Sequence, residues 1–381
     1  MPPHVTAESI AEPVANLAEN LKANLSVGSA PSLSSKPLKA SGALDKFEHF
    51  DSTPVIGREY PTLQIKDILD NDELIRDLAI TIAERGVVFF RKQDLTLKQQ
   101  KLLGLKLGQL TGRPAESGLH IHPIANADRV DGVKVDELGN AVKDHEISVI
   151  SSLAGKTYYK KSRFTRGDKF ASTGWHSDIT FEKVPADFSI LQIKELPPTG
   201  GDTLWASGYE AYDRISPAYR DLLEKLTGTY AQPGFNEVAK ANGLELYSAP
   251  RGHPDNVGEE LSAVHPLIRT NPITGWKALF AVGHHFSHVN DVTEAEGSWL
   301  KSYFNNLVAH NHDLQVRFKW NKDDVAIWDN RVTYHIATPD YDADIHYRFG
   351  NRVVAIGEKP YVDSASITRR EALEKAAQAS A

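Results

Sequence analysis

Apolar residues recur at helical spacing in two stretches near the start of the folded part of the chain. The first stretch runs from Asp72 to Arg85 and ends at Gly86, and the apolar run Val87-Val88-Phe89-Phe90 follows at once. The second stretch runs from Thr96 to Leu110. Glycine commonly ends a helix, and a short apolar run is typical of a buried strand. The pattern therefore predicts helix, buried strand and helix in that order.

The remainder of the chain has the pattern of a β-rich protein. Short apolar segments, many of them alternating, are separated by Gly/Pro turns such as Pro197-Pro198-Thr199-Gly200-Gly201. Helical spacing returns only near residues 208–226 and 293–309. The predicted strands are Glu146–Leu153, Ser189–Leu196, Asp202–Ala206, Val264–Arg269, Trp276–Val282, Gln315–Trp320, Asp324–Trp328 and Tyr347–Ile356.

About eight short strands with inserted helices favour a mainly β, α+β protein with a jelly-roll core (a double-stranded β-helix) over a doubly wound parallel sheet. Residues 1–45 are rich in Ala, Ser and Pro, and we expect a mobile tail there. Residues 46–365 then form one domain, and residues 366–381 form a C-terminal tail that can be helical.

Composition narrows the chemistry. The chain has no cysteine, which excludes disulfides, thiolate metal sites and cysteine nucleophiles. A net charge of −7 and a pI near 6.1 argue against nucleic-acid binding. No apolar stretch is long enough to cross a membrane. We expect a cytoplasmic protein that acts on small molecules, and homo-oligomerisation stays open.

One His-x-Asp pair has the layout of an iron site. His176-Ser177-Asp178 precedes a predicted core strand, and His335 lies far downstream. On an extended strand residues i and i+2 point to the same side, so both ligands could reach one ion. Two histidines and one carboxylate form the facial triad of non-haem iron(II) oxygenases. We therefore predict an iron(II) site at these three residues.

Other interpretations of the pattern must be weighed. The pairs His49-Phe50-Asp51 and His253-Pro254-Asp255 have the same spacing but lie at the edge of the tail and in a proline-containing loop. A lone histidine such as His335 is usually structural. The same three ligands could also bind zinc in a hydrolase.

Three longer motifs resemble the taurine dioxygenase family of iron(II)/2-oxoglutarate-dependent oxygenases. The resemblance covers residues 80–361. The segment Trp175–Phe181 resembles the one that carries the first two ligands, and the segment Asp324–His335 resembles the one that carries the third. Between them, the segment Lys194–Trp205 stands at the usual distance.

The resemblance implies 2-oxoglutarate as co-substrate. Arg348 matches the family's arginine for the far carboxylate, for which a guanidinium is well suited, and Thr203 matches its hydrogen-bonding companion. The stretch from His335 to Arg348 is two residues longer than usual, so Arg352 is the alternative. The alternative interpretation is that Arg348 is an ordinary charged residue on the surface.

The resemblance also implies a substrate pocket for a small anion. His122 and Arg352 match residues that bind the anionic group, and Ser172, Ile179 and Phe286 are the other predicted substrate contacts. Ser172 departs from the family, as does Ala125, so the pocket can differ in shape. Alternatively, His120 and His122 only cap a loop.

The implied activity is hydroxylation of an alkylsulfonate such as taurine by dioxygen and 2-oxoglutarate, which yields aldehyde, sulfite, succinate and carbon dioxide. The same iron chemistry on a carboxylate (an amino acid or a secondary-metabolite intermediate) or on a sulfate ester is the alternative. A non-catalytic jelly-roll binding protein is the third hypothesis, which the complete triad and both arginines disfavour.

Overall fold

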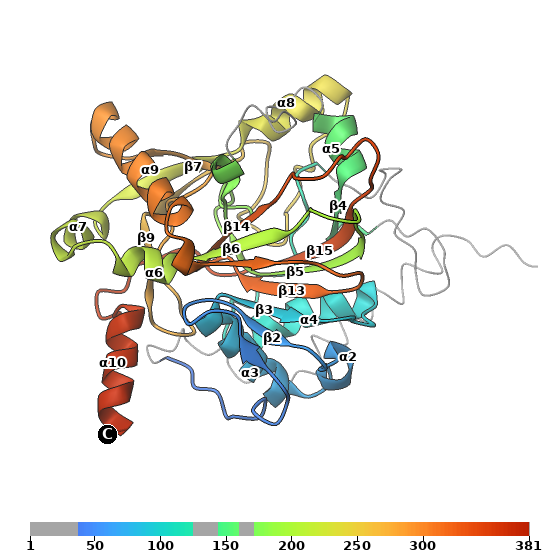
Figure 1. Ribbon diagram of the computed structural model, residues 1–381. Helices are drawn as coiled ribbons and strands as arrows, with labels where there is room; N and C mark the ends of the chain where they lie inside the picture. Colours follow the sequence, from blue (N-terminus) through green and yellow to red (C-terminus); the bar gives the residue numbers. More distant parts are fainter. Residues whose placement is uncertain (1–36, 125–143, 160–170, 381) are drawn as a thin grey trace, which may run out of the picture.

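The computed structural model describes residues 37–124, 144–159 and 171–380, and the structural statements below concern these residues. Helices and strands are mixed along the chain (Figure 1), which confirms the mixture of strands and inserted helices expected from the sequence. Residues 1–36 of the expected tail lie outside the described residues, as does Ala125.

A seven-stranded sheet forms the centre of the molecule (Figure 1). Its neighbouring strands are antiparallel, except that β2 runs parallel to β3. In spatial order the strands are β1 (Phe50–Asp51), β2 (Arg58–Tyr60), β3 (Val87–Phe90), β13 (Val325–Asp329), β5 (Ala186–Glu195), β15 (Phe349–Ile356) and β4 (Ile147–Ser151).

Three smaller antiparallel sheets complete the β structure. The first packs face to face with the large sheet and has the order β12 (Gln315–Phe318), β6 (Thr203–Ser207) and β14 (Thr333–Ala337). The others are β11 (Phe286–Val289), β7 (Thr227–Ala231) and β8 (Ser262–Pro266), and the pair β9 (Ile268–Thr270) and β10 (Lys277–Leu279).

Alternation along the central strands separates two hydrophobic cores, because neighbouring side chains of a strand point to opposite faces. Phe89 of β3 points toward the small sheet, where its ring stacks on Phe318 at 4.1 Å and meets Trp205 edge-on. Its neighbours Val88 and Phe90 belong to the core on the other face, beneath the helices. The large sheet is thus buried on both sides.

Two helices cover the outer face of the large sheet (Figure 1): α3 (Asp72–Arg85) and α4 (Leu97–Gln109). The side chain of Asn71 caps the start of α3, which ends at Gly86 with a φ of 75°. Thr96 begins α4 with a capping box that includes Gln99. Both helices and the strand β3 between them agree with the sequence pattern.

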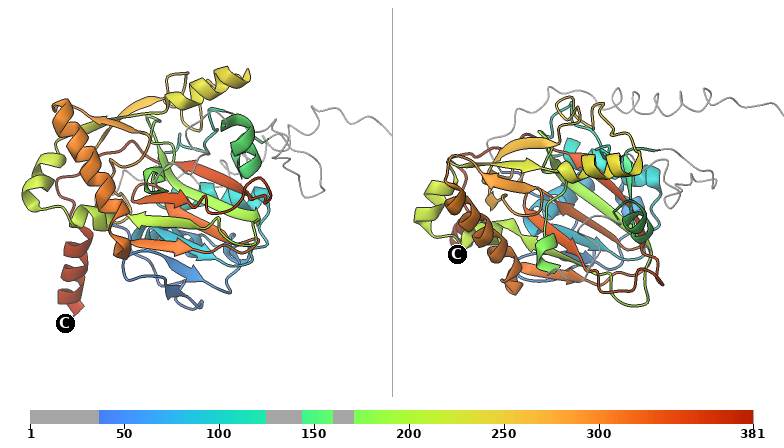
Figure 2. Two further views of the ribbon diagram at one scale, coloured as in Figure 1. Left: turned by 45° about the horizontal axis from the view of Figure 1, so that its top comes forward. Right: turned by 90° about the horizontal axis from the view of Figure 1, so that it is seen from above.

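The remaining helices lie around the sheets. In Figures 1 and 2 the helix α10 extends away from the body of the molecule, whereas α9 lies along the edge that carries β11. These helices are α2 (Ile65–Ile68), α5 (Ser152–Tyr159), α6 (Gly208–Asp213), α7 (Pro217–Leu223), α8 (Pro233–Asn242), α9 (Glu294–Ala309) and α10 (Arg369–Ser380), with 3₁₀ turns η2 (Ala171–Gly174) and η3 (His312–Leu314).

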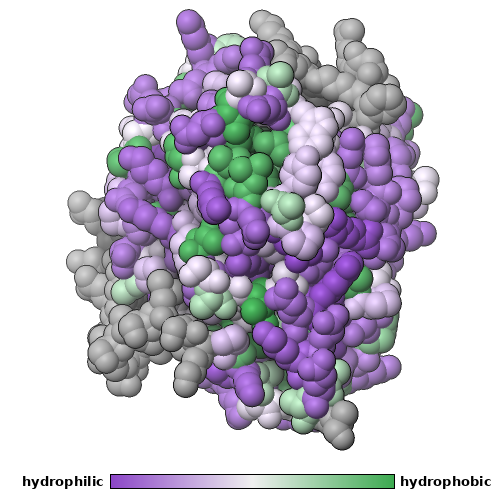
Figure 3. Space-filling view, turned by 90° about the vertical axis from the view of Figure 1, so that its left-hand side faces the viewer, coloured by the Kyte–Doolittle hydropathy of each residue, from purple (hydrophilic) through white to green (hydrophobic). Residues whose placement is uncertain are grey.

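The face that carries α7 and α9 shows hydrophobic residues among hydrophilic ones (Figure 3). Three large side chains on these two helices are about half exposed, namely Tyr219, Leu222 and Trp299. Trp299 stacks on Tyr303 with an interplanar angle of 2°. The helices thus bury one face against the small sheets and leave aromatic rings outside.

The structure differs from the sequence pattern at several places. The helix expected over residues 208–226 is two helices, because Pro217 at the start of α7 cannot continue α6. The strands β1, β2, β7, β11 and β14 were absent from the predicted strands, and the predicted strand Val264–Arg269 is divided between β8 and β9. Residues 37–45, assigned to the tail, contact the fold: Leu38 N donates to Ile273 O, and Leu44 is 4% exposed.

Within the described residues, no helix combines the length and the apolar character needed to cross a membrane.

The double-sided burial of β13 can be tested at Ile327, which is fully buried beneath the helices. We expect Ile327→Ala to lower the free energy of unfolding by about 2–5 kcal/mol, because the substitution leaves a cavity in a close-packed core. Urea denaturation measures it. Ile345→Ala, at a side chain that is 74% exposed, is the control and should change stability by less than about 0.5 kcal/mol. Equal losses would contradict the assigned core.

Candidate functional site

His176 and Asp178 are placed by a bridge and a turn rather than by the regular strand that the sequence suggested. His176 pairs with His335 of β14 through two backbone hydrogen bonds, from His176 N to His335 O and from His335 N to His176 O. Asp178 opens a turn in which Ile179 adopts a φ of 48°, and β5 begins only at Ala186. The bridge brings two predicted ligands together directly.

A glycine permits a third segment to approach the same place. Gly283 has a φ of 111°, and a Cβ atom there would lie 2.8 Å from His176 Cα and from Trp175 O. Any other residue would push the chain away. The loop that carries His284 and His285 therefore lies directly against the ligand segment.

The three predicted ligands converge. One donor atom from each of His176, Asp178 and His335 can be chosen so that all lie within 4.8 Å of one another. Among the described residues these three form the only such group of histidine and acidic side chains. His335 Nε2 lies 3.8 Å from Asp178 Oδ1, and the two imidazole rings are 4.3 Å apart.

The protonation states fit a divalent metal. Burial lowers the pKa of His176 and of His335, so both imidazoles are neutral near pH 7. Burial alone would raise the pKa of Asp178, but the charge of Arg352 and the hydrogen bond from Ser189 hold it well below its usual range. His176 Nδ1 contacts Gly174 O at 2.8 Å, so Nε2 is the nitrogen that can bind a metal. His335 Nδ1 is buried without a partner in the part of the chain that the structure describes. Two neutral nitrogens and one carboxylate suit iron(II).

Arg348 and Thr203 lie together in the interior. Arg348 Nε donates to Gly201 O at 3.0 Å, and its Nη2 lies 3.5 Å from Thr203 Oγ1. Both residues are at least 95% buried, so Arg348 is no surface charge, and within the described residues it makes no ion pair. Thr203 pairs with Ala337 and Trp205 pairs with His335, so Thr203 and His335 face the same side of their sheet.

Arg352 approaches the triad itself. Its Nη1 donates to Asp178 Oδ1 at 2.7 Å, and within residues 37–124, 144–159 and 171–380 its buried Nε has no hydrogen-bond partner. Because Arg348 and Arg352 are four residues apart on an extended segment, their side chains leave it on one face. One arginine thus lies beside Thr203 and the other beside the triad.

A cavity of about 100 Å³ opens beside His176 and Asp178, two of the three predicted ligands. Of the predicted substrate contacts, His122, Ile179 and Arg352 line the cavity. Ser172 is absent from its lining. The full lining is His122, His176, Asp178, Ile179, Phe181, Phe235, His284, His285 and Arg352. A larger groove, of about 500 Å³, lies at the start of α9 and includes none of the predicted residues.

Phe286 lies away from the cavity. Its ring is fully buried and contacts Tyr230 with ring centres 5.3 Å apart. The preceding residues His284 and His285 take the expected place instead, together with Phe235 of α8 and Phe181. The sequence did not identify Phe235 as a cavity residue, because only the tertiary fold brings α8 next to the ligands.

His120 and His122 have separate surroundings. His120 is buried, and its Nε2 lies 3.1 Å from Glu182 Oε1, which also accepts from Arg251 Nε at 2.5 Å. His122 faces the cavity and contacts the ring of Phe235 with centres 4.7 Å apart. His122 Nδ1 also accepts from Ile124 N at 3.1 Å, so the expected loop-capping role applies to His122, whereas the His120 ring contacts Glu182.

Comparisons with known proteins agree with this arrangement. Residues 48–353 match the family described as "Taurine catabolism dioxygenase TauD, TfdA family". The chain is 42% identical to the alpha-ketoglutarate-dependent dioxygenase esdpJ of Penicillium shearii, over 89% of this chain and 96% of the relative. It is 44% identical to the alpha-ketoglutarate-dependent dioxygenase btcD of Neocamarosporium betae, over 88% and 98%.

A solved structure is also similar. The crystal structure of a taurine dioxygenase from Burkholderia xenovorans superposes with a TM-score of 0.59 at 26% identity, covering 82% of this chain and 90% of that chain.

His265 contacts the backbone just after the ligand Asp178, and it should make the free energy of unfolding depend on pH. Its Nε2 lies 3.0 Å from both Thr180 O and Glu182 O, and burial lowers its pKa to about 4. The folded pKa lies below the unfolded value of 6.5, so the unfolded chain binds the proton first as pH falls. The contribution to stability is therefore complete above pH 6.5 and is lost toward pH 4.

Between pH 7 and pH 5 we expect the wild type to lose about 2 kcal/mol more stability than His265→Gln. Urea denaturation of metal-free protein at both pH values measures this, and the difference between pH values removes any constant cost of the substitution. Parallel pH profiles would contradict the assignment.

Proposed function

The chain belongs to the taurine catabolism dioxygenase TauD/TfdA family and is a 2-oxoglutarate-dependent dioxygenase that uses iron(II), and on this premise we propose that it hydroxylates a small anionic substrate. In this proposal His176, Asp178 and His335 hold the iron. The first candidate substrate is an alkylsulfonate, in keeping with the likeness to a solved taurine dioxygenase.

One observation carries the choice of an anion. Arg352 lines the same cavity as His176 and Asp178, and its Nε is buried with no hydrogen-bond partner among the described residues. An unpaired buried donor on a guanidinium is costly, and an anionic group in the cavity would satisfy it. His122 lines the same cavity and can add a second hydrogen bond to that anion.

We further propose that the large sheet and the sheet of β12, β6 and β14 form a double-stranded β-helix within residues 46–365. Rings from both sheets meet between them, with Trp205 and Trp328 5.7 Å apart and Phe89 and Phe318 4.1 Å apart. His335 and Thr203 extend from the small sheet, and Arg352 from the large one, so the site lies between the two.

The protein's own residues bind, orient and shield the reactants. When bound, iron(II) supplies the oxidising chemistry with dioxygen and 2-oxoglutarate, which yields succinate, carbon dioxide and the hydroxylated substrate. Arg348 and Thr203 hold the far carboxylate of 2-oxoglutarate. Phe181 and Phe235 exclude water from the cavity. If the hydroxylated carbon bears a sulfonate, loss of sulfite leaves an aldehyde, and no protein acid or base is required.

An oxygen-consumption screen with iron(II) and 2-oxoglutarate tests the substrate class. We expect consumption with alkylsulfonates, accompanied by sulfite, and none in His176→Ala, which lacks one ligand. Carboxylates and sulfate esters form the other arms of the screen. Consumption with these alone would exclude the sulfonate and retain the anion, and consumption with neutral compounds alone would exclude the anion. Turnover in His176→Ala would refute the metal site.

Arg348→Gln should weaken 2-oxoglutarate binding about 10- to 100-fold, because a hydrogen bond to a charged group contributes about 1.5–3 kcal/mol. Calorimetric titration of the protein saturated with Mn(II) measures the dissociation constant. Arg352→Gln is the matched control and should leave that constant near the wild-type value. The reverse pattern would make Arg352 the anchor of 2-oxoglutarate.

A further inference from the structure

The two oxygens of the Asp178 carboxylate have different surroundings. Oδ1 faces His335 Nε2 at 3.8 Å and accepts a hydrogen bond from Arg352. Oδ2 accepts a hydrogen bond of 2.8 Å from the hydroxyl of Ser189, which is fully buried on β5. The carboxylate thus presents one oxygen to the other ligands and has the second tied to the sheet.

The direction of the Ser189 hydrogen bond is fixed by Asn330. Asn330 Nδ2 donates to Ser189 Oγ at 2.8 Å. A hydroxyl group has a single proton to donate, and the oxygen of Ser189 is here an acceptor from Asn330. Asp178, whose ionised carboxylate can only accept, must therefore receive the proton of Ser189.

The orientation of the Asn330 amide is fixed in turn. Its Oδ1 lies 3.0 Å from Trp328 Nε1 and 3.2 Å from the backbone N of Asp178, and both of these groups can only donate. The amide oxygen must face these two donors, so the amide nitrogen faces Ser189. No flipped arrangement satisfies all three contacts.

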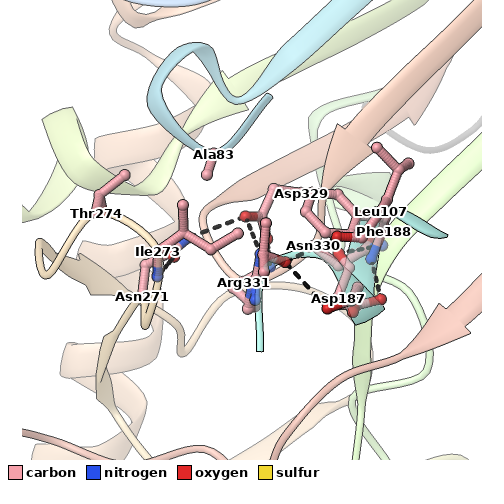
Figure 4. A network of polar contacts seen from close by, with 12 residues as sticks. Ala83, Leu107, Asp187, Phe188, Asn271, Ile273, Thr274, Asp329, Asn330 and Arg331 are labelled. Carbon is pink, nitrogen blue, oxygen red and sulfur yellow. Dashed lines mark hydrogen bonds and ion pairs between the residues drawn. The ribbon is translucent and has the colours of Figure 1, made fainter. Parts of the chain in front are cut away.

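The backbone of Asn330 is also held firmly. Its N donates to Asp187 O at 2.7 Å, and its O accepts from Ser177 Oγ at 2.6 Å. Figure 4 shows Asn330 between Asp187 and the ion pair of Arg331 with Asp329, in which the two side chains approach within 2.7 Å. Asn330 is 1% exposed, so the relay begins at a rigid point.

We propose that Asn330 and Ser189 are positioning residues for the metal ligand Asp178. The relay from Asn330 through Ser189 holds Oδ2 against β5, so that Oδ1 is the oxygen offered to the metal. This inference rests on the metal site of the proposed function and adds two residues that the ligand pattern does not contain. Hydrogen-bonded partners of ligands typically contribute 10- to 100-fold to metal affinity.

Two buried serines allow a matched test. Ser189 and Ser177 are both within 1% of complete burial, and both hydroxyls contact Asn330. Only Ser189 connects Asn330 to the carboxylate. Calorimetric titration of metal-free protein with Co(II), without 2-oxoglutarate, gives the metal dissociation constant for Ser189→Ala and Ser177→Ala. Thermal unfolding of the metal-free proteins gives their stability.

We expect both variants to lose stability and Ser189→Ala alone to bind Co(II) about 10- to 100-fold more weakly. Equal Co(II) affinities in the two variants would overturn the relay, because a merely structural hydroxyl would affect both alike. If Ser189→Ala does not fold, Asn330→Ala carries the same comparison: weaker Co(II) binding than Ser177→Ala supports the relay, and equal binding overturns it. A wild type that binds no Co(II) would instead overturn the metal site itself.

Discussion

Asp178 places an ionised carboxylate in a site almost closed to water, and such a charge is costly unless opposite charge and hydrogen bonds compensate it. Arg352 supplies the charge, and Ser189 supplies a hydrogen bond. These two partners come from β15 and β5, neighbours in the large sheet. The position of the carboxylate thus depends on the register of that sheet, and a change of register would leave the charge unpaired.

The same sheet register also gives separate partners to two guanidinium groups, which would otherwise repel each other. Arg348 and Arg352 leave one segment on the same face, yet each has a different acceptor: Gly201 O for the first and Asp178 Oδ1 for the second. Gly201 has a φ of 71°, and a Cβ atom there would lie 3.1 Å from Arg348 Cδ. The glycine before β6 therefore makes room for the buried guanidinium, while the ligand carboxylate neutralises the other.

Local pattern was sufficient for the elements and for the outline of the site. Helical spacing, the stop at Gly86 and a short apolar run predicted α3, β3 and α4, because these features act within a few residues. The motifs around His176 and His335 identified three side chains that the structure brings together. Pattern failed where longer contacts decide. The strand β14 is defined by its pairing with β6 and by the bridge to His176, and Phe286 is turned into the hydrophobic core.

The sequence by itself determined which chemical groups are available: two histidines and a carboxylate without any thiol, two arginines four residues apart, and strands of alternating character. Tertiary structure alone decided which atoms meet. The pairing of His176 with His335, the loop of Gly283 against that bridge and the relay from Asn330 to Asp178 all join segments more than 100 residues apart. Such contacts depend on sheet register and on close backbone approach, which no local pattern encodes.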